Sequence, residues 1–93
     1  MKRYHVIAQG RVQGVGFRGF VQAAAVRERL TGSVRNMENG MVEIFIQGEP
    51  DAIDRFLDEI QKGNRWIRVD DLSFKQVPVD PGETKFRTNY SYW

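Results

Sequence analysis

The chain has 93 residues, no cysteine and a single histidine, His5. Without cysteine neither a disulfide framework nor thiolate chemistry is available, which excludes disulfide-stabilised scaffolds and cysteine-dependent enzymes. With one histidine, any metal site would have to consist almost wholly of carboxylates. The absence of cysteine fits a reducing compartment.

Long hydrophobic runs and blocks of like charge are also missing. No apolar stretch reaches the length of a signal-peptide core or a membrane span, so we expect a cytoplasmic protein with no membrane partner. The 14 Lys and Arg residues nearly balance the 12 Asp and Glu residues, and the net charge is +2. Because these cations are dispersed, the chain can favour an anionic ligand but lacks a nucleic-acid footprint. The length predicts one domain, residues 1–93.

Hydrophobic periodicity predicts an α+β fold. Strands are expected at residues 4–11, 32–36, 41–47, about 67–77 and about 84–90, and helices at 18–29 and 50–63. Asn39-Gly40 predicts a tight hairpin, in which both central residues must tolerate a positive φ. The helical spacing of Ile53, Phe56, Leu57 and Ile60 is typical of a buried stripe. The order β-α-β-β-α-β indicates a ferredoxin-like sandwich, an antiparallel sheet of four to five strands with two helices on one face.

Residues 14–19 (GVGFRG) match the dinucleotide-binding pattern G-x-G-x-x-G between a predicted strand and a predicted helix. That pattern requires parallel strands in a doubly wound sheet, whereas the Asn39-Gly40 hairpin makes this sheet antiparallel. Asn36 also stands where the acidic residue that binds the ribose is expected. The sequence therefore disfavours a dinucleotide-binding domain.

The glycine loop remains a candidate anion site. A glycine-rich turn that opens a helix presents backbone N–H groups and the positive end of the helix dipole. Arg18 stands at the helix start, where a cation is disfavoured unless it binds an anion, and a guanidinium can hold two phosphate oxygens. Taken alone, the loop is equally consistent with a structural turn and a solvent-facing arginine.

Asn36, at the end of the second predicted strand, is the second candidate. In this topology the first and second strands run in the same direction with the third between them, so their ends lie about 10 Å apart. An arginine and a bound phosphate can span most of that gap. An amide accepts and donates hydrogen bonds, so it can orient a water molecule without titrating. An asparagine before a turn more often serves to stabilise the turn itself. Together with the glycine loop, however, Asn36 favours a phosphoryl-binding site.

Residues 10–18 (GRVQGVGFR), 31–36 (TGSVRN) and Asn39-Gly40 resemble the acylphosphatase family. The similarity extends through residues 42–48 (VEIFIQG) and the second helix to Phe86. It implies an enzyme that hydrolyses small-molecule acyl phosphates, which are carboxyl-phosphate mixed anhydrides, to a carboxylate and inorganic phosphate. It also implies that no metal, cofactor or covalent intermediate takes part.

The resemblance also implies roles for individual residues. Arg18 would bind the phosphate together with N–H groups of loop 13–18, and Asn36 would position the attacking water. The substrate-binding residues expected in the loop are Gly14, Val15, Gly16 and Phe17. Phosphate or sulfate is expected to bind in the same loop, and we expect a monomer.

Some positions depart from the family pattern. Gly19 stands where the family usually has a side chain, and Ser33 where tryptophan is common. Arg29 replaces a glycine that usually ends the first helix, so the helix must end differently or Arg29 must adopt a left-handed conformation. The residues Ser91, Tyr92 and Trp93 extend past the shared pattern, and no role is assigned to them.

Two alternatives stay open. An RNA-binding sheet would use Glu43, Phe45 and Gln47 on its exposed face, a poor stacking platform, so we expect no nucleic-acid partner. The same domain also serves in larger proteins that handle carbamoyl phosphate, although the chain's end at the domain favours a free-standing hydrolase.

Of the remaining residues, His5 lacks a visible carboxylate partner, and four aromatic residues are expected to pack the sheet: Trp66, Phe74, Phe86 and Tyr90. The sequence identifies neither the physiological substrate nor a site that binds its acyl part.

Overall fold

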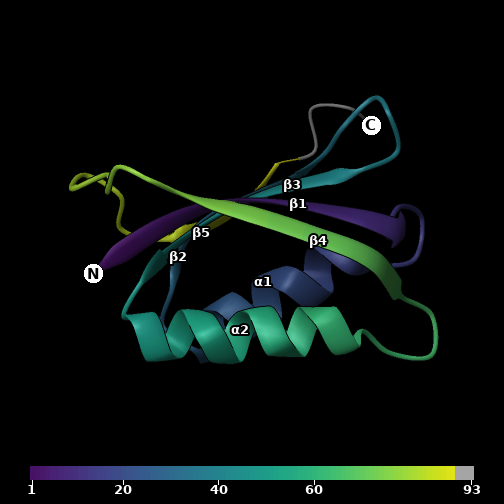
Figure 1. The fold of residues 1–93 in the computed structure, drawn as a ribbon, viewed down its shortest axis with the longest axis horizontal. Helices are drawn as coiled ribbons and strands as arrows, with labels where there is room; N and C mark the ends of the chain where they lie inside the picture. The colour runs from purple at the N-terminus through teal and green to yellow at the C-terminus, as the bar shows by residue number, and fades with distance from the viewer. Residues whose placement is uncertain (90–93) are drawn as a thin grey trace.

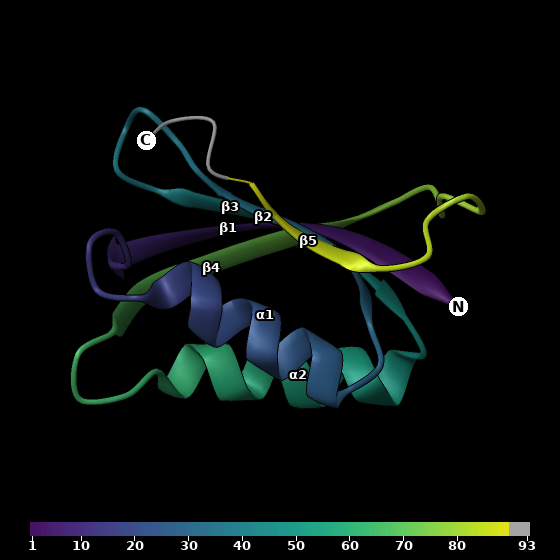
Figure 2. The same cartoon turned by 180° about the vertical axis from the view of Figure 1, so that it is seen from behind.

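The computed structural model describes residues 1–89, in which the strands and helices follow one another in the predicted order. The elements are β1 (Lys2–Arg11), α1 (Phe17–Arg27), β2 (Thr31–Asn36), β3 (Val42–Gly48), α2 (Pro50–Lys62), β4 (Arg68–Val77) and β5 (Phe86–Asn89). Both helices lie against one face of a single sheet (Figures 1 and 2). The ferredoxin-like α+β fold is therefore confirmed. Neither helix in the described part of the chain is long and apolar enough to cross a membrane.

The sheet has the strand order β4-β1-β3-β2-β5. β3 pairs antiparallel with both β1 and β2, so β1 and β2 run in the same direction, as the topology predicts. β5 pairs parallel with β2, which makes the sheet mixed instead of wholly antiparallel. The reason is geometric: after β4 the chain turns through residues 78–85 and runs back on the opposite edge, antiparallel to β4 and therefore parallel to β2.

The core lies between the sheet and the helices. Alternate residues of the strands point into it, and α2 contributes the predicted stripe, with Leu57 only partly buried. The prediction for the aromatic residues was partly wrong: Phe86 is buried, but Trp66 is 62% exposed and Phe74 is 54% exposed. Trp66 falls in the turn before β4, and Phe74 lies on the edge strand, where its ring packs edge-on against Tyr4. Tyr90 lies outside the described residues.

The predicted hairpin between β2 and β3 is present, but its turn is longer than the tight type expected. Gly40 has a φ of 89°, whereas Asn39 does not have a positive φ. The Gly40 N–H donates to the Met37 carbonyl, and the Met37 N–H donates to the Met41 carbonyl. This pattern is typical of a hairpin loop in which a turn is followed by one left-handed glycine.

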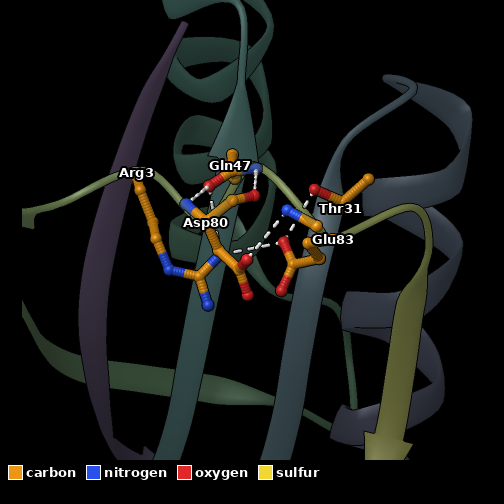
Figure 3. A network of polar contacts seen from close by, with 6 residues as sticks. Arg3, Thr31, Gln47, Asp80 and Glu83 are labelled. Atoms are coloured by element: carbon orange, nitrogen blue, oxygen red, sulfur yellow. Dashed lines mark hydrogen bonds and ion pairs between the residues drawn. The ribbon is translucent and has the colours of Figure 1, made fainter.

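A polar network fastens the connection of residues 78–85 to the sheet (Figure 3). Glu83 accepts hydrogen bonds from Arg3 on β1 at 2.9 Å and from Thr31 on β2 at 2.7 Å. Gln47 on β3 donates to the Asp80 carbonyl at 2.9 Å and accepts from the Asp80 N–H at 2.7 Å. Since the connection leads into β5, the network also fixes where β5 begins.

The end of α1 explains how the chain accommodates Arg29. The Leu30 N–H donates to the Ala25 carbonyl and the Arg29 N–H to the Val26 carbonyl, which is a Schellman motif. Arg29 occupies its left-handed position with a φ of 59°, and it is the one non-glycine residue among residues 1–89 with a positive φ. Of the two possibilities that the sequence left open, the strained one is therefore observed.

We expect Arg29→Gly to stabilise the protein. A left-handed conformation costs a residue with a Cβ about 1–2 kcal/mol, part of which is offset by the greater chain entropy of glycine. The free energy of unfolding should therefore rise by about 0.5–1 kcal/mol. Arg29→Ala removes the same charge but keeps a Cβ, so it should show no such gain in urea denaturation. Equal stabilities of the two variants would contradict this explanation.

Candidate active site

A pocket of about 260 Å³ lies where the β1–α1 loop meets the end of β2. Its lining consists of Val12, Gly14, Gly16, Phe17, Arg18, Gly19 and Asn36. Arg18 and Asn36 are eighteen residues apart in sequence, and the parallel course of β1 and β2 brings them to the same pocket. The arrangement is the one that strand topology predicts.

The loop backbone forms one wall of this pocket. Gly14 and Gly16 have φ values of 73° and 80°, a left-handed conformation that side-chain-bearing residues rarely adopt. Gly16 is the N-cap of α1, and no side chain caps this helix end. The first N–H groups of a helix have no acceptor within the helix. These groups and the positive end of the helix dipole therefore face the loop, where they can bind an anion.

Arg18 lies in the first turn of α1, a turn that contains no acidic residue. Its side chain is half-buried, and its Nη1 donates to the Asn89 carbonyl at the end of β5 at 3.3 Å. The bond ties the guanidinium to the last described residue of the edge strand. The sequence did not predict this contact, because it depends on β5 pairing beside β2.

Asn36 points from the last position of β2 toward the pocket. It is 3% exposed, and its Oδ1 has no hydrogen-bond partner within residues 1–89. A buried acceptor without a partner costs about 1–3 kcal/mol. Natural folds retain such an atom mainly where it has a role, so this oxygen is available to accept a hydrogen bond from a ligand or a water molecule.

Gln13 connects the loop to the hairpin that follows Asn36. Its Nε2 donates to the carbonyls of Met37 and Met41, both at 2.9 Å. Gln13 was predicted only as the first residue of the loop. Its two bonds could not be found from the sequence, because they depend on the long-range position of the hairpin.

The other predicted loop residues are only partly in the pocket. Gly14, Gly16 and Phe17 contribute to the lining, whereas the Val15 side chain packs against the core. Val12 and Gly19 line the pocket without having been predicted. For Val12 a signal was present, because it continues the inward alternation of Val6 and Ala8 along β1.

His5 has a partner that the sequence did not reveal. On the open face of the sheet its Nε2 lies 2.8 Å from Oε2 of Glu43, and Arg35 Nε donates to the other oxygen of that carboxylate at 2.6 Å. Partial burial raises the pKa of Glu43, but the hydrogen bonds from His5 and Arg35 outweigh it and hold the pKa below its ordinary value. These groups satisfy one another on the sheet surface and do not line the pocket.

The pocket has few chemical groups. Among residues 1–89, none of those that line the pocket carries a hydroxyl, thiol, imidazole, amine or carboxylate. Within residues 1–89, no three His, Asp or Glu side chains are grouped as metal ligands. What the lining offers is one guanidinium, one amide and backbone N–H groups. Such a site can bind and orient an anion, but its own side chains offer no covalent nucleophile.

Comparison with known proteins supports the resemblance seen in the sequence. The family model described as Acylphosphatase matches residues 4–88. The acylphosphatase of Geobacillus thermodenitrificans is 48% identical over 97% of this chain and 96% of its own length. The crystal structure of acylphosphatase from Bacillus subtilis superposes with a TM-score of 0.91 at 38% identity, covering 97% of this chain and 100% of that one. HypF from T. kodakarensis contains a similar unit, with a TM-score of 0.84 at 33% identity over 96% of this chain but 12% of HypF.

Proposed function

The chain belongs to the acylphosphatase family of acyl phosphate hydrolases, and from this premise we propose how its pocket performs the hydrolysis. The phosphoryl group binds to the backbone N–H groups of loop 13–18 and to the guanidinium of Arg18. Asn36 holds the water molecule that attacks phosphorus. The reaction uses no metal and forms no covalent intermediate.

The observation that carries the proposal is the buried Oδ1 of Asn36, which has no hydrogen-bond partner among residues 1–89 and faces a pocket whose other wall is the N-terminal loop of α1. A water that donates a hydrogen bond to this oxygen is oriented with a lone pair free to attack. The guanidinium of Arg18 can donate hydrogen bonds to two phosphoryl oxygens. The two groups thus match the two requirements of phosphoryl transfer, a positioned nucleophile and stabilised charge on the equatorial oxygens.

The chemistry of the substrate explains why so few groups suffice. The leaving group of an acyl phosphate is a carboxylate whose conjugate acid has a pKa of about 4, so it departs without a protonating acid. The phosphoryl group has a second pKa of about 6, so its own oxygens can take the proton of the attacking water. The described residues that line the pocket include no carboxylate, imidazole or amine, which fits this reaction.

The lining also supports direct attack by water. A covalent phosphoenzyme requires a nucleophilic side chain within reach of phosphorus. Within the described part of the chain, the residues that line the pocket offer only the weakly nucleophilic Asn36 amide and the Arg18 guanidinium, which stays protonated. Water is therefore the nucleophile in this proposal, and the reaction is a single displacement.

Hydrolysis of benzoyl phosphate tests the activity. The purified chain should release benzoate and inorganic phosphate in equal amounts, and inorganic phosphate should inhibit competitively because it binds the same loop. If the folded protein failed to accelerate this hydrolysis, the proposed function would be wrong for this chain.

Gln13→Ala should lower kcat while leaving the fold intact. The substitution removes both bonds to the hairpin, so the phosphate loop and Asn36 lose their shared anchor. We expect kcat to fall about ten-fold, because a small misplacement of reacting groups costs up to about a hundred-fold. The same assay would follow Gln13→Glu, whose carboxylate cannot donate to the two carbonyls and should be equally impaired. Wild-type turnover in both variants would refute a positioning role for Gln13.

A further inference from the structure

A second group of cations lies at the same end of the sheet as the phosphate loop. It consists of Arg11 at the end of β1, Arg68 at the start of β4, and Arg65 with Trp66 in the turn between α2 and β4; we call it the cationic patch. All four residues are exposed. Figure 1 shows that the α2–β4 turn, the β1–α1 loop and the β2–β3 hairpin occupy one end of the molecule.

The turn that carries Arg65 and Trp66 is well ordered by hydrogen bonds. Oδ1 of Asn64 accepts from the N–H groups of Trp66 and Ile67, at 2.8 and 2.9 Å. The guanidinium of Arg65 lies over the Trp66 ring, 5.4 Å from its centroid. Stacking occupies the face of a guanidinium but leaves its in-plane N–H donors available, and these match the geometry of a carboxylate or phosphate.

The patch carries positive charge that the described residues only partly neutralise. Arg11 and Arg68 are direct partners in the β1–β4 register, and like charges at such positions are destabilising. Arg68 forms an ion pair with Asp70 at 2.9 Å. Arg11 and Arg65 form no ion pair with any of residues 1–89. An anion bound here would therefore relieve repulsion as well as gain hydrogen bonds.

The patch adjoins the candidate active site along the chain at the end of β1. Arg11 precedes Val12, which lines the phosphate pocket, and Arg11 and Arg68 line the depressions on both sides of the β1–β4 end. The end of β1 thus lies between the phosphate loop and the cationic patch. A substrate held by its phosphoryl group in the loop has its acyl part outside the loop, at this end of the molecule.

We propose that the cationic patch is a second anion-binding subsite, which binds a carboxylate or phosphate carried by the acyl part of the substrate. The inference rests on the proposed function and narrows it to acyl phosphates of acids that bear a further negative charge. Arg11 and Arg65 supply the donors, and Trp66 supplies a flat apolar surface beside them. The subsite affects the capture of substrate and leaves the chemical step to Arg18 and Asn36.

Two substrates that differ by one carboxylate test the proposal: benzoyl phosphate and 4-carboxybenzoyl phosphate. In the double variant Arg11→Gln/Arg65→Gln, kcat/KM for the carboxylated substrate should fall about five-fold, since an exposed charge pair changes affinity by about two- to five-fold. The value for benzoyl phosphate should stay within about two-fold of wild type. High salt should remove the difference between variant and wild type. Lys2→Gln is the control, because it removes one cation from the other end of β1 and should leave both substrates unaffected.

Three results would overturn the subsite. An equal loss on both substrates would indicate general attraction of anions, and no loss on either would show that the patch plays no part in hydrolysis. If a single-stranded oligonucleotide inhibited the wild type but not the double variant while neither substrate was affected, the patch would bind nucleic acid instead. Failure of the proposed function can be distinguished from failure of the subsite, because the wild type would then hydrolyse neither substrate.

Discussion

Replacing Arg18 by alanine is expected to lower kcat/KM for benzoyl phosphate by about 10³-fold or more. Of the described residues that line the pocket, Arg18 is the one with a cationic side chain, and it stands where the helix dipole already favours an anion. In our proposal its loss removes a bidentate hydrogen bond to the phosphoryl oxygens, which serves both to bind the substrate and to stabilise the charge that develops on those oxygens. Initial rates over a range of substrate concentrations measure the effect.

Two further variants separate the role of Arg18 from general charge effects. Arg18→Lys keeps the charge but loses the planar fork, so it should recover only a small part of the activity. Arg27→Ala removes a cation from the other end of α1, where Arg27 pairs with Glu59, and should stay within about two-fold of wild type. Circular dichroism and urea unfolding establish that each variant is folded. If folded Arg18→Ala kept more than about a tenth of the wild-type kcat/KM, Arg18 would not be the phosphate clamp.

Replacing Asn36 by alanine should lower kcat about 10²- to 10³-fold with a much smaller change in KM. In our proposal Asn36 holds the water and Arg18 holds the phosphate, so loss of the amide removes an interaction needed in the transition state and not for binding. Stability should respond differently from activity. Because Oδ1 has no partner within residues 1–89, its removal relieves an unsatisfied buried acceptor, and the free energy of unfolding should not fall as it does for a structural asparagine.

The hairpin provides a matched control for Asn36. Asn39 accepts a hydrogen bond from the Met41 N–H at 3.0 Å but does not line the pocket, so Asn39→Ala should cost some stability and little turnover. The two asparagines are thus expected to show opposite patterns. If Asn36→Ala instead lowered stability and left kcat near the wild-type value, Asn36 would be a structural residue.

The sequence was a good guide to the site where its geometry follows from strand direction. The loop of residues 13–18 follows the end of β1, and Asn36 is the last residue of β2; the ferredoxin-like strand pairing places both at the same edge of the sheet. The hairpin was also predictable, because the Asn39-Gly40 pair is a local signal. The details of its turn were not, since the backbone of Asn39 depends on how five residues close the loop.

Contacts between segments far apart in the chain could not be predicted from the sequence. The bonds from Gln13 to the hairpin, from Arg18 to Asn89, and from His5 to Glu43 each join segments far apart in sequence, and no local pattern contains their relative positions. Trp66 was misjudged for a related reason: aromatic residues near a strand usually pack against a core, but a turn held by Asn64 places this ring in solvent. The cationic patch became visible only once β1 and β4 were paired.

A titration of the ¹⁵N-labelled protein with inorganic phosphate, followed by NMR, tests the central claim most directly. That claim is that loop 13–18 and Arg18 bind the phosphoryl group and that Asn36 lies beside it. We predict saturable shifts of the backbone amides in the loop and of the Asn36 side-chain amide, and loss of this response in Arg18→Ala. Saturable shifts confined to another surface, such as the cationic patch, or an undiminished response of the loop in Arg18→Ala, would contradict the account.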